Sequence, residues 1–487
     1  MPAKRGRATQ ARVAQPCGHA SQGVVSHYSR HVTSNSPQSK TPPAAFAKAK
    51  KIGIVAAVSI GVGGMIGAGI FSILGVVASI SGSAMWISFF IGGVVVAFPA
   101  YSYVKLGQTF PSIGGAVTFM VKGWGDTKKA GTFNVFQYLA FVISIALYAS
   151  GFAAYAQGFW DIPAQFYAIG VVLLFTLINF VGSRLMGRAE STIVIIKVTI
   201  LIVFVIAAFV TFTPQSWENL SPNNWTGAVA MIVGAGVLFV GYEGFGLITN
   251  AAANMTNPIK EIPRAIWTSL AIVVVIYLAV SIGVVGQVPL DQLKTLGDSA
   301  LAVAAEPALG QFGFTLISIA ALLSTASAVN ATLFGSANVA YQISKNGGLP
   351  PAFDKKLWGK DVEGLFITAG LVVVFVLIFP LSAVASMGSA GFLLVYVVVN
   401  LGHLRVRSQT GAKAWPLYVG IVLCLVLFVF LFGYMLMEQV TSAIAMVITF
   451  LVSWLVELWW RGRSHRSFRQ LLDEVDHRHK DAGAAGA

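Results

Sequence analysis

Two ionisable side chains lie within long apolar stretches of this sequence, where a charge is costly. Lys197 stands in STIVIIKVTILIVFV, and Glu243 stands in FVGYEGFG. A charge at the centre of a membrane helix costs roughly 2.5–3.5 kcal/mol even on a lenient insertion scale, and such residues are functional candidates. Lys197 either extends its amine to the membrane surface or stays buried as a group that gains and loses a proton. Glu243 could titrate, gate a pocket or form a structural hydrogen bond in its protonated form.

Glycines interrupt two of the apolar stretches at similar depths. The first, GVGGMIGAGIF, holds five, at positions 61, 63, 64, 67 and 69, and the second holds Gly241, Gly244 and Gly246 around Glu243. Each glycine weakens a helix by roughly 1 kcal/mol relative to alanine. Close packing through small residues explains one glycine face, but not glycines on every face. Two interrupted spans in corresponding positions predict an inverted-repeat transporter with a site near mid-membrane.

An interrupted helix has a specific binding chemistry. Unwinding exposes amide N–H groups at the start of one half-helix, where they favour an anion. It also exposes carbonyl groups at the end of the other half-helix, where they favour a cation. Such backbone is tolerated within a membrane only where it is buried in protein or lines a cavity. A zwitterionic α-amino acid matches this pair of sites.

Composition places these stretches in a membrane. Apolar residues make up 56% of the 487 positions and charged residues 10%, against about 25% charged residues in soluble proteins. A helix needs about 20 residues to cross roughly 30 Å of hydrocarbon, and the alternation typical of membrane strands is absent. We therefore predict an all-α integral membrane protein with twelve transmembrane helices. The predicted spans are 52–81, 84–106, 133–158, 164–182, 191–212, 227–252, 264–287, 313–341, 364–380, 383–402, 414–434 and 439–460.

The basic residues predict an orientation. Of the 32 Lys and Arg residues, 30 fall in the tails and in alternate loops on one side of the predicted membrane; Lys197 and Lys294 are the exceptions. Both termini are therefore expected in the cytoplasm. Residues 1–51 lack Asp and Glu and are predicted to be a disordered basic cytosolic tail, although a transit peptide has a similar composition. Residues 52–461 form the predicted transporter domain, and 462–487 a cytosolic C-terminal tail.

Several function classes find no support in the sequence. Cys17 and Cys424 are too far apart to form a zinc or redox motif, and there is no Walker-type glycine loop for ATP. The net charge of +14 follows from membrane orientation rather than from nucleic acid binding. No nucleophile, metal or acid–base cluster indicates an enzyme. We expect no metal, no cofactor and no nucleic acid partner.

Four motifs resemble those of the amino acid–polyamine–organocation superfamily of permeases, over roughly residues 50–460. GGMIGAGIF is similar to its first-helix motif, and PSIGGAVTF at 111–119 to the loop after its second helix. GYEGFGLITNAAANMTNPIKEIPRAI at 241–266 resembles its sixth helix and following loop, and SAGFLLVYVVVNLGHLRVR at 389–407 its tenth helix. GFGLITN is particularly similar to the broad-specificity proton-coupled members. The resemblance implies a 5+5 inverted repeat with discontinuous first and sixth helices, plus two C-terminal helices.

Carried over by motif position, the resemblance implies a backbone site for an amino acid. The substrate carboxylate would meet the amides near Gly67, Ala68 and Gly69. The substrate amino group would meet the carbonyls near Met65, Val240, Gly241 and Glu243. Many members carry an acidic residue where Gly246 stands, and often Glu-Asp where Ala253 and Asn254 stand. The first departure disfavours a cationic amino acid or a polyamine.

The resemblance also implies a role for Lys197. Some proton-coupled permeases of this superfamily have a fifth-helix lysine whose amine occupies the sodium position of sodium-coupled relatives. Lys197 would then face the carbonyls of Gly63 and Ile66 and a hydroxyl group of the eighth helix. The candidate hydroxyl groups are those of Ser324, Thr325 and Ser327.

Together these observations predict a secondary active transporter that imports amino acids by proton symport with alternating access. An exchanger of the same fold and a non-transporting amino acid sensor are the alternatives. The expected partners are a small-molecule amino acid and the lipid bilayer, with protons as the coupling ion. The chain is expected in the plasma or inner membrane, as a monomer or weak oligomer.

Overall fold

The computed structural model describes residues 52–112, 114–181, 186–345, 347–353 and 363–463. Within these ranges the regular secondary structure is helical, apart from two isolated bridge pairs, Ile52 with Met255 and Gly82 with Trp225. The predicted tails, 1–51 and 462–487, lie almost wholly outside the described residues. The prediction of an all-α chain is confirmed for the part that the structure describes.

The long helices match the predicted spans. Eleven segments in the described ranges are long and apolar enough to cross a membrane, and α13, with 16 residues, is a shorter apolar helix where 364–380 was predicted. Eleven of the twelve are single helices: α1 (Ile54–Ser81), α2 (Met85–Thr109), α4 (Lys128–Ala156), α5 (Ala164–Val181), α6 (Met186–Val210), α10 (Pro258–Gln287), α12 (Ala300–Lys345), α13 (Glu363–Ile378), α14 (Leu381–Thr410), α15 (Ala414–Glu438) and α16 (Val440–Arg463). The sixth span comprises α8 (Ala228–Val237), the 3-10 helix η3 (Leu238–Tyr242) and α9 (Phe245–Asn250).

Short helices connect the spans. They are α3 (Ala116–Trp124), α7 (Pro214–Asn219), α11 (Leu290–Leu293) and the 3-10 segments η2 (Pro222–Asn224), η4 (Ala252–Asn254) and η5 (Pro351–Phe353). Within α12, Gly310 has a φ of 67°, a left-handed conformation that glycine adopts without strain. This residue separates a first segment of α12 from the part that matches the predicted span 313–341.

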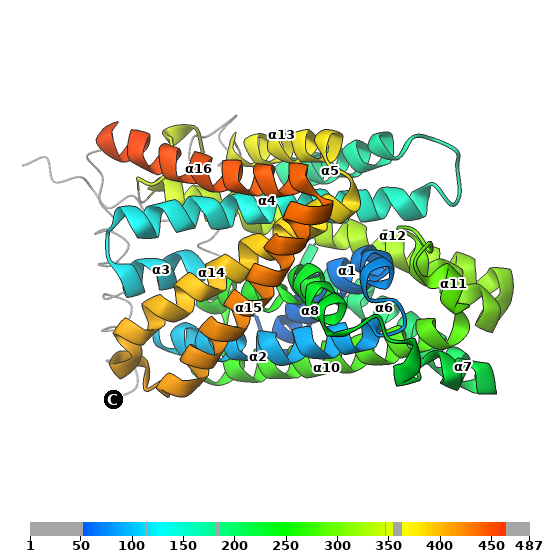
Figure 1. Ribbon diagram of the computed structural model, residues 1–487. Coiled ribbons are helices and arrows are strands. Elements are labelled where there is room, and N and C mark those ends of the chain that lie inside the picture. The colour runs from blue at the N-terminus through cyan, green and yellow to red at the C-terminus, as the bar shows by residue number, and fades with distance from the viewer. Residues whose placement is uncertain (1–51, 113, 182–185, 346, 354–362, 464–487) are drawn as a thin grey trace, which may run out of the picture. The chain divides into compact units, whose positions relative to one another are not determined.

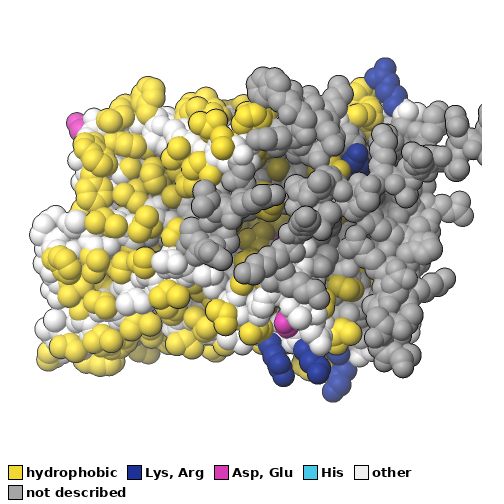
Figure 2. All heavy atoms as spheres, turned by 180° about the vertical axis from the view of Figure 1, so that it is seen from behind, with side chains coloured by type: hydrophobic (Ala, Val, Ile, Leu, Met, Phe, Trp, Pro, Cys, Tyr) yellow, Lys and Arg dark blue, Asp and Glu magenta, His cyan; other side chains and the backbone are white. Residues whose placement is uncertain are grey.

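The long helices lie alongside one another, with α1 and α8 in the middle of the view (Figure 1). Burial separates inner from outer helices: 89% of the apolar window is buried in the sixth span and in α14, against 28% in α6 and α15. Large apolar side chains such as Leu177, Ile206 and Val429 are exposed on the outer helices, and Figure 2 shows a largely hydrophobic face. Since no water is available to such a surface in a bilayer, these side chains are placed to contact lipid.

One end of the helices is rich in basic residues, and we call it the basic end. Arg405 stacks on Trp124 with 4.0 Å between its guanidinium carbon and the ring centroid, and the backbone N–H of Lys413 donates to Tyr101 at 2.9 Å. Arg461 bonds to the connection between α3 and α4. α3 therefore lies at this end, with the last turns of α2, α14 and α16, whereas α7 and α11 lie at the other end (Figure 1).

The first helix corrects one expectation, because α1 runs without interruption through its five clustered glycines. A Cβ atom built on any of them would lie within 3.0 Å of a neighbouring segment. The neighbours differ from one glycine to the next: Ile248 and Ser269 at Gly61, Glu190 at Gly63, Leu247 and Gly244 at Gly64, Ala328 at Gly67 and Tyr277 at Gly69. Glycines occur on several faces of α1 because several elements pack closely against it.

Candidate functional site

The sixth span is interrupted as predicted, and α14 supports the interruption. α-Helical hydrogen bonding ends at Val237, and the chain continues as 3-10 helix to Tyr242. The buried hydroxyl of Ser389 accepts a hydrogen bond from the Val240 N–H at 2.9 Å and donates to the Val237 carbonyl at 2.5 Å. A buried backbone group without a partner costs about 1–3 kcal/mol. Ser389 therefore stabilises the irregular backbone at the centre of the protein.

Tyr277 joins the two segments that were predicted to bind the substrate amino group. Its hydroxyl group donates to the Met65 carbonyl of α1 at 2.5 Å and lies 3.0 Å from the Gly241 carbonyl of η3. The side chain is fully buried on α10. Sequence reasoning missed Tyr277, because nothing in the pattern of α10 distinguishes it from an ordinary buried tyrosine.

The residues of the predicted carboxylate site lie within a continuous helix. Gly67, Ala68 and Gly69 lie within the continuous α1, where amide groups pair with carbonyls four residues earlier. The side chain of Ala68 lies outside the described residues. A substrate carboxylate could reach these amides only after α1 opens locally.

Glu243 lies at the centre, beside an aromatic cluster. Its side chain is 4% exposed, and within the described part of the chain its carboxyl group forms no hydrogen bond. Tyr103, Phe245 and Tyr396 pack on one another with ring centroids 5.3–5.5 Å apart. A Cβ atom on Gly246 would lie 2.7 Å from Oε1 of Glu243 and 3.8 Å from the Tyr103 ring. The Tyr396 hydroxyl is buried without a partner. No hydrogen bond to a neighbouring helix is therefore described for the Glu243 carboxyl group or the Tyr396 hydroxyl group.

Lys197 is fully buried, which excludes the extended conformation that reaches the membrane surface. Its ammonium group donates to the carbonyl of Gly63 at 2.9 Å. Ile66, the other residue whose carbonyl was predicted to face Lys197, is also fully buried, but no hydrogen bond joins the two in the described structure. Lys197 thus links α6 to the glycine-rich part of α1.

The three candidate hydroxyl groups of α12 differ from one another. Thr325 donates to Ala321 of its own helix at 2.7 Å, and Ser324 is buried without a partner. Ser327 donates to the carboxylate of Glu190 at 2.5 Å. Sequence analysis missed Glu190, because this residue directly precedes the predicted span 191–212. Its spacing of seven residues from Lys197, which places both on one helix face, is the signal that could have found it.

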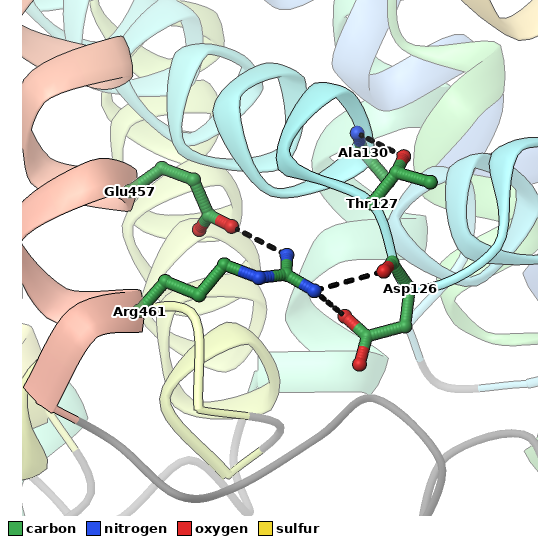
Figure 3. A network of polar contacts seen from close by, with 5 residues as sticks. All are labelled: Asp126, Thr127, Ala130, Glu457 and Arg461. Atoms are coloured by element: carbon green, nitrogen blue, oxygen red, sulfur yellow. Dashed lines mark hydrogen bonds and ion pairs between the residues drawn. The ribbon is translucent and has the colours of Figure 1, made fainter.

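A separate polar network holds the last helix at the basic end. Figure 3 shows the Arg461 guanidinium between Glu457 of the same helix and Asp126, which precedes α4. Arg461 bonds to Glu457 at 2.9 Å and to the Asp126 carboxylate at 2.7 Å. Thr127 caps α4 by accepting from the Ala130 N–H. The network lies at the start of α4 and does not include Lys197 or Glu243.

No group of three or more His, Cys, Asp or Glu side chains suited to a metal ion occurs in the described ranges. The polar chemistry of the centre therefore consists of backbone carbonyls, tyrosine and serine hydroxyls, Glu243 and Lys197.

Comparison with known proteins agrees with this fold. Residues 52–455 match the amino acid permease family. The uncharacterized protein MJ0609 of Methanocaldococcus jannaschii is 40% identical over 86% of this chain and 98% of its own length. The inner membrane transport protein YbaT of Escherichia coli is 33% identical over 82% of this chain and 93% of its own length. A crystal structure of the Eremococcus coleocola manganese transporter is similar in fold, with a TM-score of 0.54 and 13% sequence identity. The similarity covers 83% of this chain and 93% of that transporter.

The fold and the match define a multi-pass membrane transporter rather than an enzyme. The chain belongs to the amino acid permease family. This confirms the prediction, made from its motifs, that it is a permease of the amino acid–polyamine–organocation superfamily. Its activity is amino acid transport, with a small-molecule substrate.

Proposed function

We propose that this protein imports amino acids by proton symport, with Lys197 as the group that carries the proton. The observation that carries the proposal is the hydrogen bond from the buried Lys197 ammonium to the Gly63 carbonyl. A buried charge is retained where it has a partner and a function. Protonated, Lys197 holds α6 against α1; deprotonated, it releases α1. Proton binding is thereby linked to the conformation of the helix that was predicted to bind substrate.

The driving force is sufficient for accumulation. A potential of 100 mV supplies roughly 2.3 kcal/mol for each proton that accompanies a substrate. That free energy corresponds to roughly 50-fold accumulation of a neutral substrate. A single lysine that exchanges one proton per cycle is enough.

We infer a substrate site between α1 and η3. Its backbone contacts are those predicted from the motifs, with the carbonyls of Met65 and Gly241 for the substrate ammonium group. Glu243 and the Tyr396 hydroxyl, both buried and without hydrogen-bond partners, are available to polar groups of the substrate. The aromatic and apolar surroundings, including Phe245 and Val240, favour a neutral amino acid.

We further propose that the basic end faces the cytoplasm of a plasma or inner membrane. Basic residues gather at the ends of α14 and α16 and on α3, and cytoplasmic loops are those enriched in Lys and Arg. The path for substrate and ion lies within one chain, so a monomer is the transporting unit. Alternating access then exposes the site between α1 and η3 to each side in turn.

Flux measurement in proteoliposomes tests the proposed function. A thermal-shift screen of the twenty amino acids on purified protein first identifies a ligand. With an acidic exterior, the wild type should accumulate this ligand, and Lys197→Met should only equilibrate it. Lys294→Met, which alters an exposed lysine, serves as the control.

Four results would contradict the proposal. Undiminished acid-driven accumulation by Lys197→Met would show that Lys197 does not carry the proton. Flux that requires internal amino acid and ignores the pH gradient identifies an exchanger, and binding without flux identifies a sensor. Glu243→Gln should weaken binding while leaving the pH dependence of uptake unchanged, and a lost pH dependence would move the coupling role to Glu243.

A further inference from the structure

Glu190 lies between Lys197 and the basic end on the same face of α6. The two residues are seven positions apart, which is about two turns and roughly 10 Å along a helix axis. Glu190 is half-buried, whereas Lys197 is fully buried. The carboxylate is therefore less deeply buried than the amine.

Both side chains contact the same residue of α1. Lys197 donates to the Gly63 carbonyl at 2.9 Å, and a Cβ atom on Gly63 would lie 2.6 Å from Oε1 of Glu190. Gly63 thus lies beside both side chains, and a larger residue at position 63 would crowd the Glu190 carboxylate.

Ser327 orients the carboxylate and extends the polar surroundings. Its hydroxyl group donates to Oε2 of Glu190 at 2.5 Å, a short bond of the kind formed with an ionised acceptor. One turn further along α12, Asn330 accepts from the Asn179 amide of α5 at 2.8 Å. Because α12 ends at Lys345, the direction from Ser327 to Asn330 leads toward the basic end. Polar groups from α5, α6 and α12 thus continue beyond Lys197.

The titratable side chains described on α1, α5, α10 and α12 lie away from Glu190. α1 carries no titratable side chain in its described residues. Glu306, Tyr341 and Lys345 lie toward the ends of α12, and the single titratable side chain of α5 is Tyr167, near its start. On α10 the titratable residues are Lys260, Glu261 and Arg264 in its first turns and Tyr277, which is bonded to Met65 and Gly241. Among the side chains that the structure describes on α1, α5, α6, α10 and α12, Lys197 is therefore the charged group that shares a helix face with Glu190.

We propose that Glu190 accepts the proton released by Lys197 and passes it to water at the basic end. In the first step an N–H bond of the ammonium breaks and an O–H bond forms on the carboxylate, leaving a neutral amine and a neutral acid. In the second step the acid loses its proton to water and regains its bond to Ser327 as a carboxylate. This inference rests on the proposed proton symport, and Glu190 is its release group.

Four variants in proteoliposomes test the proposal, with two readouts for each. Acid-driven accumulation requires proton release, whereas exchange of labelled for unlabelled substrate at equal pH does not. Glu190→Gln keeps an oxygen that can accept from Ser327 but cannot carry the proton. At 100 mV the driving force allows roughly 50-fold accumulation. Glu190→Gln should accumulate about tenfold less substrate than the wild type, with exchange unchanged. Ser327→Ala removes the hydrogen bond and keeps the carboxylate, so its accumulation should fall less than that of Glu190→Gln.

The remaining variants separate the possible failures. Glu306→Gln removes an exposed carboxylate elsewhere and should match the wild type. If Lys197→Met loses accumulation while Glu190→Gln retains it, Glu190 is not the release group and the proposed symport stands. If Lys197→Met accumulates substrate normally, the proposed symport itself fails. If Ser327→Ala reproduces the Glu190→Gln defect, the carboxylate serves to hold α6 against α12 and the release role is wrong.

Discussion

The hydroxyl group of Tyr277 lies 3.0 Å from the carbonyl oxygen of Gly241, and the same hydroxyl donates to Met65 at 2.5 Å. A hydroxyl group carries one proton, so it can fully satisfy only one of these two carbonyls at a time. A substrate ammonium group carries three N–H bonds and could serve both. Tyr277 thus holds α1 and η3 together through two carbonyls that could also accept hydrogen bonds from a cation.

Tyr277→Phe should weaken both folding and binding. It removes the shared donor from two buried carbonyls, and each unsatisfied group costs about 1–3 kcal/mol. We expect a lower melting temperature and about fivefold weaker amino acid binding by thermal shift, corresponding to about 1 kcal/mol. Tyr167→Phe, which removes a bond to Trp160 in a peripheral loop, should change neither. Unaltered binding by Tyr277→Phe would show that the hydroxyl does not position the site.

Ser389→Ala should destabilise the interrupted sixth span. The change leaves the Val240 N–H and the Val237 carbonyl without the partner they share, at a cost of about 2 kcal/mol. Denaturation of the purified protein in detergent measures this difference. The matched control is Ser386→Ala on the same helix, because Ser386 bonds only to Ser382 one turn earlier. Equal stability of the two variants would contradict the role of Ser389.

Gly67→Ala should disturb the contact between α1 and α12. The added methyl group would lie 2.7 Å from the Ala328 side chain and 3.1 Å from the Ser324 carbonyl, and overpacking of this kind costs about 1–3 kcal/mol. Gly433→Ala on α15 is the control, since nothing lies within 4 Å of the added carbon. At that position alanine should preserve stability or raise it slightly, because alanine favours a helix. The two melting temperatures should therefore move in opposite directions or differ by several degrees.

Arg461 should matter chiefly through the buried carboxylate that it neutralises. Glu457 is 2% exposed and bonds to Arg461 at 2.9 Å. Removing one partner of a buried pair leaves an uncompensated charge, whereas removing both can be nearly neutral. Arg461→Gln should therefore lower stability more than the double variant Arg461→Gln with Glu457→Gln. Strictly additive effects in this double-mutant cycle would show that the two side chains are not coupled.

Much of the architecture could be predicted from residue types alone. The twelve apolar stretches identified the helices because a bilayer leaves a spanning segment few alternatives. The glycines around Glu243 identified the interruption of the sixth span, and the burial of Lys197 agrees with its place in an apolar stretch. Each of these features depends on local composition and on the membrane as a solvent.

Contacts between distant segments decided the rest. The glycines of the first helix predicted an interruption, yet α1 is continuous, because several neighbours approach it where it lacks side chains. Tyr277, Ser389 and Glu190 acquire their importance only from backbone and side-chain groups brought to them by folding. The sequence by itself determined which segments enter the membrane and where a helix is weak, since hydrophobicity and helix propensity are local properties. Only the tertiary structure decided which carbonyls are satisfied and which charge lies beside Lys197, since hydrogen bonds depend on distances between helices that are far apart along the chain.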